Sequence, residues 1–125
     1  MSLTTRCRTR LQGVHPDLVR VVEAVAAESP HEIFITEGLR TKARQQQLVA
    51  AGASRTMNSR HLTGHAIDFA VRVAGQVRWD WPLYQQVGEV FERVAARLGV
   101  PIVWGGRWRT FRDGPHVELD RRTYP

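Results

Sequence analysis

His61 and Asp68 have side chains that commonly bind metal ions, and the short interval between them contains a glycine. Zinc binds histidine nitrogen and carboxylate oxygen at about 2.0–2.2 Å, whereas an extended chain would separate the two residues by roughly 23 Å. Gly64 lets the chain fold back between them, because glycine adopts positive φ without strain. The following residues alternate as in a β-strand and place Asp68 on one face with the small side chains of Ala66 and Ala70. This face has room for an ion, so the sequence predicts a metal site.

A third ligand and a general base are both found near the end of the chain. A catalytic zinc ion usually has three protein ligands and one water. His116 is the best third ligand, because adjacent strands lie about 4.8 Å apart and it could face Asp68 across a sheet. Zinc lowers the pKa of its bound water to about 7, and a nearby acid must take up the proton. Asp113 and Glu118 flank His116, and position alone leaves both open as the base.

The spacing of these residues resembles a known signature. Its residues here are Ser59, His61, Gly64, Ala66 and Asp68, followed later by the stretch from Asp113 to His116. They resemble the metal motif of the zinc D-Ala-D-Ala carboxypeptidase and dipeptidase superfamily, and more closely that of phage endolysins that are L-alanyl-D-glutamate endopeptidases. The resemblance extends over nearly the whole chain, through Leu11–Leu18, Thr36–Thr41, Gln45, Leu48 and Trp104–Trp108. The two-part metal motif is its specific element.

The resemblance implies a zinc peptidase with one catalytic Zn²⁺ held by His61, Asp68 and His116. It also implies that Asp113 acts as general base and acid. Many members of the wider superfamily have glutamate at that position, and the endolysin branch is expected to have aspartate. The implied reaction is hydrolysis of the L-Ala–D-Glu bond in the stem peptide of bacterial peptidoglycan by metal-activated water.

Other residues have expected roles around this centre. By resemblance, Arg40 polarises the scissile carbonyl and stabilises the tetrahedral oxyanion, a role that suits a fixed cation. Ser59 resembles a family serine near the metal, which contacts either a ligand or the substrate. Glu118, if it is not the base, is expected to hydrogen-bond a metal ligand. Trp108 is expected either to form a wall of the cleft or to lie in the core.

The composition indicates a globular protein with a basic surface. Its 125 residues suffice for one domain with a hydrophobic core. We therefore expect a single catalytic domain over residues 1–125, with a loosely ordered lead-in over about residues 1–10 and no separate wall-binding domain. The formal net charge of +6 and the pI of about 10.9 favour a polyanionic partner. The single cysteine excludes an internal disulfide and fits a reducing compartment.

The sequence shows neither a signal peptide nor an apolar run long enough to span a membrane. We therefore expect the protein to accumulate in the cytoplasm of the host bacterium, without membrane insertion, and to reach the cell wall at lysis. By analogy with phage lysins, a holin would assist this release. The expected partner is the peptidoglycan stem peptide, and the protein is expected to be a monomer that binds no nucleic acid.

The order of the predicted elements favours an α+β fold. Apolar residues at helical spacing predict helices over residues 16–28 and 82–98, and end signals predict a further helix over residues 42–51. Short strands are predicted near residues 33–35, 66–73, 77–79, 102–104 and 116–119. Thr41 and Pro82 are placed to begin helices, and Gly52 and Gly99 to end them. Such an order indicates a small antiparallel sheet with about three helices packed around it.

Two other functions are compatible with parts of this pattern. One is a D-Ala-D-Ala carboxypeptidase or dipeptidase of the same superfamily, which would cleave a different bond. The other is a non-catalytic basic module that binds wall polymer or nucleic acid and contains a structural metal. A structural zinc normally has four ligands, often thiolates, and the chain has only Cys7 and no recognisable nucleic-acid-binding motif. The endopeptidase is therefore the favoured interpretation.

Overall fold

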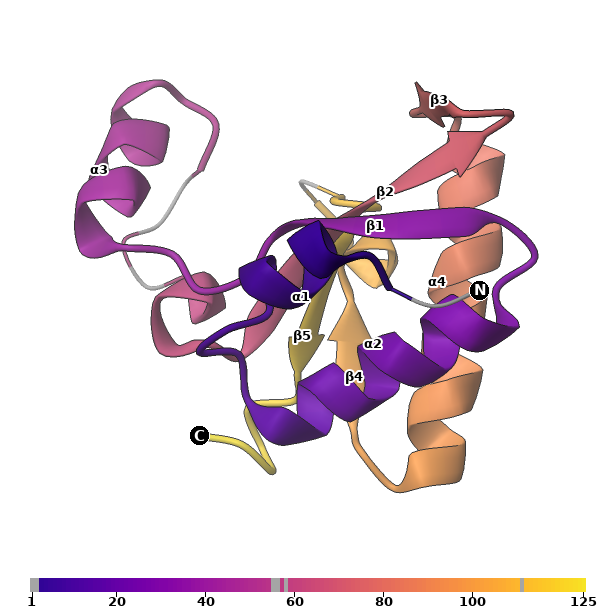
Figure 1. Cartoon of the computed structure of the whole chain (residues 1–125). Coiled ribbons are helices and arrows are strands. Elements are labelled where there is room, and N and C mark those ends of the chain that lie inside the picture. The colour runs from indigo at the N-terminus through magenta and orange to yellow at the C-terminus, as the bar shows by residue number, and fades with distance from the viewer. Residues whose placement is uncertain (1–2, 55–56, 58, 111) are drawn as a thin grey trace.

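The computed structural model describes residues 3–54, 57, 59–110 and 112–125 (Figure 1). Its elements are α1 (Thr5–Arg10), α2 (Pro16–Glu28), β1 (Glu32–Glu37), α3 (Lys42–Ala50), the 3-10 helix η1 (Arg60–Thr63), β2 (Ala66–Val73), β3 (Gln76–Arg78), α4 (Trp81–Leu98), β4 (Ile102–Trp104), the 3-10 helix η2 (Gly105–Arg107) and β5 (His116–Leu119). The predicted α+β class, with a small antiparallel sheet in a single domain, is confirmed.

β2 is the strand on which the sheet is centred. The strands are antiparallel and follow the order β1-β2-β5-β4, and β3 pairs with the end of β2. Alternation along β2 sends Ile67, Phe69 and Val71 into the core, which also contains the packed faces of α2 and α4. Asp68 lies between these residues in sequence and therefore points to the opposite face. The strand that builds the core thus also carries a predicted metal ligand.

Apolar spacing and end signals define the helices. The side chains fully buried at helical spacing are Leu18, Val21, Val22 and Val25 in α2 and Val87, Phe91 and Val94 in α4. Thr41 caps α3 by accepting a hydrogen bond from the Arg44 N–H. Gly99 ends α4 with a φ of 72°, the left-handed conformation common after helices. The three helices predicted from the sequence are confirmed to within one residue at each end.

Across the described residues, no helix is both long enough and apolar enough to cross a membrane.

The N-terminal segment differs from its prediction. The sequence predicts a loosely ordered lead-in over about residues 1–10; residues 1–2 lie outside the described residues, and Thr5–Arg10 forms α1. Leu3, Cys7 and Leu11 recur at helical spacing, and all three are more than nine-tenths buried. This apolar stripe is short and is interrupted by arginines, so the sequence does not display a clear helical period there.

Candidate metal centre

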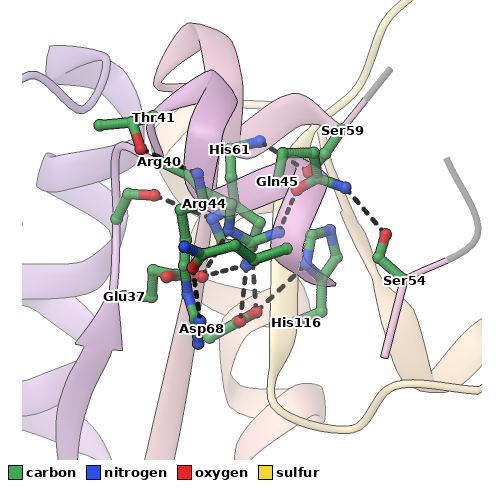
Figure 2. A network of polar contacts seen from close by, with 12 residues as sticks. Glu37, Arg40, Thr41, Arg44, Gln45, Ser54, Ser59, His61, Asp68 and His116 are labelled. Atoms are coloured by element: carbon green, nitrogen blue, oxygen red, sulfur yellow. Dashed lines mark hydrogen bonds and ion pairs between the residues drawn. The ribbon is translucent and has the colours of Figure 1, made fainter. Parts of the chain in front are cut away.

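Three side chains that can bind a metal meet beside β2 (Figure 2). His61 comes from η1, Asp68 from β2 and His116 from β5. Asp68 Oδ1 lies 3.2 Å from His61 Nε2 and 3.2 Å from His116 Nδ1. One potential ligand atom from each residue lies within 4.8 Å of the other two. The antiparallel register pairs Asp68 directly with His116, so the structure brings together the three residues that the sequence predicted as ligands.

The chain folds back between His61 and Asp68 as expected. Gly64 ends η1 with a φ of 75°, and a Cβ at this position would lie 2.3 Å from the carbonyl oxygen of Gly13. Only glycine tolerates such a close backbone approach at positive φ. Ser59 caps η1, where its Oγ accepts a hydrogen bond from the His61 N–H at 3.2 Å. Ser59 therefore holds the turn that carries a candidate ligand.

Hydrogen bonds on the outer side of each imidazole determine which nitrogen faces the centre. His61 Nδ1 lies 2.9 Å from the Gly38 carbonyl oxygen, and His116 Nε2 lies 2.9 Å from Glu118 Oε1. Both partners are acceptors, so both outer nitrogens carry hydrogen. The inner nitrogens of neutral rings would then direct two lone pairs at an oxygen of Asp68. This arrangement requires either protons or a cation between the three groups, and a divalent cation fits all three donor atoms at once.

In the absence of a cation, protons occupy the centre. Burial alone would lower the pKa of His116, but hydrogen bonds to Asp68 and Glu118 outweigh it and raise that pKa to about 9. Burial alone would raise the pKa of Asp68, but hydrogen bonds from His116 and His61 hold it well below its usual range. The opposite shifts describe a buried ion pair between Asp68 and His116. A bound metal would replace the protons that sustain this pair.

The cluster lies in a cleft with a volume of about 580 Å³, a size that accommodates a small ligand or a short peptide segment. Every site residue predicted from the sequence lines this cleft; these are Arg40, Ser59, His61, Asp68, Trp108, Asp113, His116 and Glu118. The walls are rich in charged groups of both signs. The surface around the candidate metal centre is thus suited to a polar, charged substrate.

Asp113 and Glu118, the two candidate bases, have different surroundings. Glu118 is engaged with the ring of His116, as described above, and its Oε2 lies 3.9 Å from Arg121 Nε. Asp113 is half-buried, and no side chain among the described residues hydrogen-bonds its carboxylate. Burial, and next the negative charge of Asp68, raise the pKa of Asp113. Asp113 therefore has the properties of a proton-transfer group more clearly than Glu118 does.

Arg40 lies beside the cluster, but its guanidinium group is already occupied. Its Nε donates to Glu37 Oε1 at 2.7 Å and its Nη1 donates to Gln45 Oε1 at 2.6 Å. Its Nη2 contacts Glu37 and lies 3.7 Å from Asp68 Oδ2. The backbone N–H of Arg40 also donates to the His61 carbonyl oxygen at 2.8 Å. Arg40 is therefore a fixed cation whose guanidinium group lies within ion-pair distance of the Asp68 carboxylate.

Comparisons with known proteins assign the chain to a family. The family model described as phage L-alanyl-D-glutamate peptidase matches residues 1–124. The chain belongs to this family. The L-alanyl-D-glutamate peptidase of Escherichia phage T5 is 34% identical over 119 residues, which cover 92% of this chain and 86% of that protein. The peptidase of the same name from Listeria phage A118 is 40% identical over 94 residues, which cover 74% of this chain and 32% of that protein.

A bacterial relative and a solved structure agree with the family assignment. The peptidoglycan L-alanyl-D-glutamate endopeptidase CwlK of Bacillus subtilis is 35% identical over 114 residues, covering 78% of this chain and 66% of that protein. The crystal structure of the Serratia marcescens L-Ala D-Glu endopeptidase ChiX matches with a TM-score of 0.94 and 46% identity, covering 100% of this chain and 94% of that one. The predicted family resemblance is confirmed, and so is the interpretation of the chain as an enzyme.

Trp108 and the chain that precedes β5 complete the cleft of this family member. Trp108 is half-buried, and its ring centroid lies 5.0 Å from that of His116. It therefore forms a wall of the cleft, one of the two roles expected for it. Trp104 is in the core, where its indole N–H donates to the Gly114 carbonyl oxygen at 2.7 Å. This hydrogen bond holds the segment between Asp113 and His116.

Close packing around Gly105 also places this segment, and no specific feature of the sequence predicts it. The Gly105 carbonyl oxygen accepts a hydrogen bond from the Asp113 N–H at 3.1 Å. A Cβ on Gly105 would lie 2.4 Å from the Asp113 carbonyl oxygen and 3.1 Å from His116 Cβ. The missing side chain thus lets the predicted base and a predicted ligand lie against η2. The glycine pair at 105–106 suggested only a turn.

Proposed function

We propose that this protein is a zinc-dependent endopeptidase that hydrolyses the L-Ala–D-Glu bond in the stem peptide of bacterial peptidoglycan. The observation that carries this proposal is the His61–Asp68–His116 cluster at a peptide-sized cleft, in a chain of the phage L-alanyl-D-glutamate peptidase family. The name of the phage T5 peptidase supports the L-Ala–D-Glu bond as the one that is cleaved, and the name of CwlK supports peptidoglycan as the polymer.

The donor set supports zinc as the metal. Two imidazole nitrogens and one carboxylate oxygen are ligands that zinc accepts, and three protein ligands are typical of a catalytic site. Bound there by His61, Asp68 and His116, zinc would supply Lewis-acid activation of water at neutral pH. The outer hydrogen bonds to Gly38 and Glu118 would keep both rings in the orientation that ligation requires.

Asp113 is proposed to move the protons. It would accept a proton from the attacking water and then donate it to the amine of D-glutamate as the peptide bond breaks. A carboxyl group with a raised pKa serves both steps better than an ordinary one, because its proton affinity lies closer to neutral pH. Glu118, which is engaged with His116, is proposed to orient that ring.

Arg40 and Trp108 are proposed to support the substrate. The side-chain contacts of Arg40 to Glu37 and Gln45 fix its charge close to Asp68. It would stabilise negative charge on the scissile carbonyl oxygen through its field at short range. Trp108 would limit the position of the peptide beside His116.

We also propose where the enzyme acts. It would remain in the host cytoplasm until lysis and then reach the wall, with release assisted by a holin. The net charge of +6 supports retention on the anionic wall polymer once it arrives.

Digestion of purified peptidoglycan tests the proposal. The protein is treated with a chelator, reloaded with zinc, and the products are identified by mass spectrometry. We expect new amino-terminal D-glutamate after zinc addition and none with the chelator. Release of free D-alanine instead would indicate the carboxypeptidase, and the absence of both products would refute a stem-peptide hydrolase. Equal activity in the chelated protein would refute the metal requirement.

A further inference from the structure

Four arginines of the described part of the chain line the cleft, and their partners distinguish them. Arg40 and Arg121 each lie within ion-pair distance of a carboxylate. Arg60 is buried, and its Nη2 donates to backbone carbonyl groups of the C-terminal segment. Arg44 is exposed on α3, and among the described residues no carboxylate lies within ion-pair distance of it. Arg44 is therefore the cleft cation whose charge is least compensated within the described part of the protein.

The contacts of Arg44 leave its guanidinium group available to a ligand. Its recorded side-chain partner is the neutral Oε1 of Gln47, at 3.5 Å from Nη1, which is long for a hydrogen bond. Arg44 is labelled in Figure 2, and it lines the same cleft as Asp68. It lines the cleft from α3, whereas the metal-binding side chains come from η1, β2 and β5. It can therefore contact a part of the substrate other than the scissile bond.

The proposed substrate has an anionic group next to that bond, and this step rests on the proposed function. A glutamyl residue has two carboxyl groups, and continuation of the peptide uses only one. The other remains a carboxylate on the residue whose nitrogen leaves. In the cleft this carboxylate would approach Asp68, Asp113 and their neighbours, so it needs a compensating cation. A guanidinium group matches a carboxylate with two parallel hydrogen bonds.

We propose that Arg44 binds the glutamyl carboxylate that does not continue the peptide. Arg44 thereby determines specificity: it makes the enzyme prefer a substrate with a free carboxylate over one in which this group is a carboxamide. Arg40 is less suited to this role, because Glu37 and Gln45 already occupy its nitrogens. The charge of Arg121 is partly compensated by Glu118, and this would weaken the attraction of Arg121 for a second carboxylate.

The test uses two synthetic stem peptides that differ only in this group, one with the carboxylate and one with the carboxamide. We expect the zinc-loaded wild type to show a kcat/KM about tenfold higher for the acid, as for a charge-assisted hydrogen bond in a partly exposed site. Arg44→Gln is expected to remove this preference, mainly through KM, with little change for the amide. Arg44→Lys is expected to keep part of it, because the charge remains.

Two matched variants control for charge alone. Lys42→Gln removes a cation from the same helix at an exposed position that does not line the cleft, and it is expected to keep the wild-type preference. Arg121→Gln removes a cation from the cleft and is expected to keep most of the preference. An unchanged preference in Arg44→Gln, or its loss in Arg121→Gln instead, would overturn the assignment.

The two peptides also separate this inference from the proposed function. If the wild type cleaves both peptides equally well, Arg44 does not select the carboxylate, but the endopeptidase activity stands. If the wild type cleaves neither, the proposed function itself fails. Metal content and thermal unfolding of each variant identify any loss that comes from misfolding, and the amide peptide reports on the intact catalytic centre.

Discussion

Removal of the metal is expected to make the stability of this protein fall between neutral and alkaline pH. In the folded, metal-free protein the pKa of His116 is about 9, against 6.5 for an unperturbed histidine. A group whose pKa is raised by folding stabilises the folded state fully below its unfolded pKa. This stabilisation is lost as the pH rises through the folded pKa. The decline should therefore lie between about pH 6.5 and pH 9.

The size of this decline follows from the same two values. Each tenfold difference in proton affinity between the folded and unfolded states corresponds to about 1.4 kcal/mol. The rise in the pKa of His116 from 6.5 to about 9 thus corresponds to about 3 kcal/mol of unfolding free energy. Asp68 adds nothing in this range, because its lowered pKa keeps it ionised throughout. With a small domain typically stable by about 5–15 kcal/mol, such a loss is readily measured.

Urea unfolding followed by circular dichroism measures the decline. The chelated protein is compared at several pH values from 6 to 9.5 with the zinc-loaded protein and with chelated His116→Gln. Saturating zinc should abolish the decline, because the metal then occupies the atoms that otherwise hold the proton. His116→Gln should abolish it as well, because it removes the titrating ring. Equal stability of the chelated wild type at pH 6.5 and 9.5, or an unchanged decline in His116→Gln, would refute the ion pair.

Three substitutions test other parts of the site. Asp113→Asn should keep one zinc per chain by metal analysis and lower kcat by about 10²- to 10⁴-fold in a peptide-cleavage assay, as for loss of a general base; near-normal turnover would exclude Asp113 from that role. Gly105→Ala should lower the unfolding free energy by about 1–3 kcal/mol and reduce zinc affinity, because the new Cβ meets backbone that cannot move freely; unchanged zinc affinity would show that the segment adapts. Gln45→Ala should cost about 1–3 kcal/mol in urea unfolding, because Arg40 Nη1 loses its acceptor; a neutral effect would mean that water replaces the amide.

The sequence predicted the parts of this site that depend on local pattern. The alternation of β2 placed Asp68 opposite the core residues, and Gly64 predicted the turn that returns the chain from His61. Both features arise from backbone geometry within a few residues, so they can be predicted from the sequence before the fold is known. The pairing of His116 with Asp68 required a guess about strand neighbours. That guess was possible because both residues lie in short predicted strands and both side chains can bind the same metal ion.

The parts that the sequence did not predict depend on contacts between distant segments. The hydrogen bond from the His61 ring to the Gly38 carbonyl oxygen involves a backbone atom, which carries no side-chain signal. The bonds of Arg40 to Glu37 and Gln45 depend on how α3 follows β1. Gln45 is completely buried, and the sequence hints at this only through its polar side chain inside a short helix and its place in the family resemblance. Burial, however, is not visible before the fold is known.

The outer hydrogen bonds of the two rings explain how one cluster can serve both a protonated and a metal-bound state. Gly38 and Glu118 accept from the outer nitrogens in either state, so the ring orientations do not depend on what occupies the centre. The charge of Asp68 attracts both protons and a cation, but the cluster can bind a metal only when the inner nitrogens of the two rings are deprotonated. Because the same ion pair raises the pKa of His116, protons compete with the metal more strongly here than at an isolated histidine. Metal affinity must therefore rise with pH up to about 9, over the same range in which the metal-free protein loses stability.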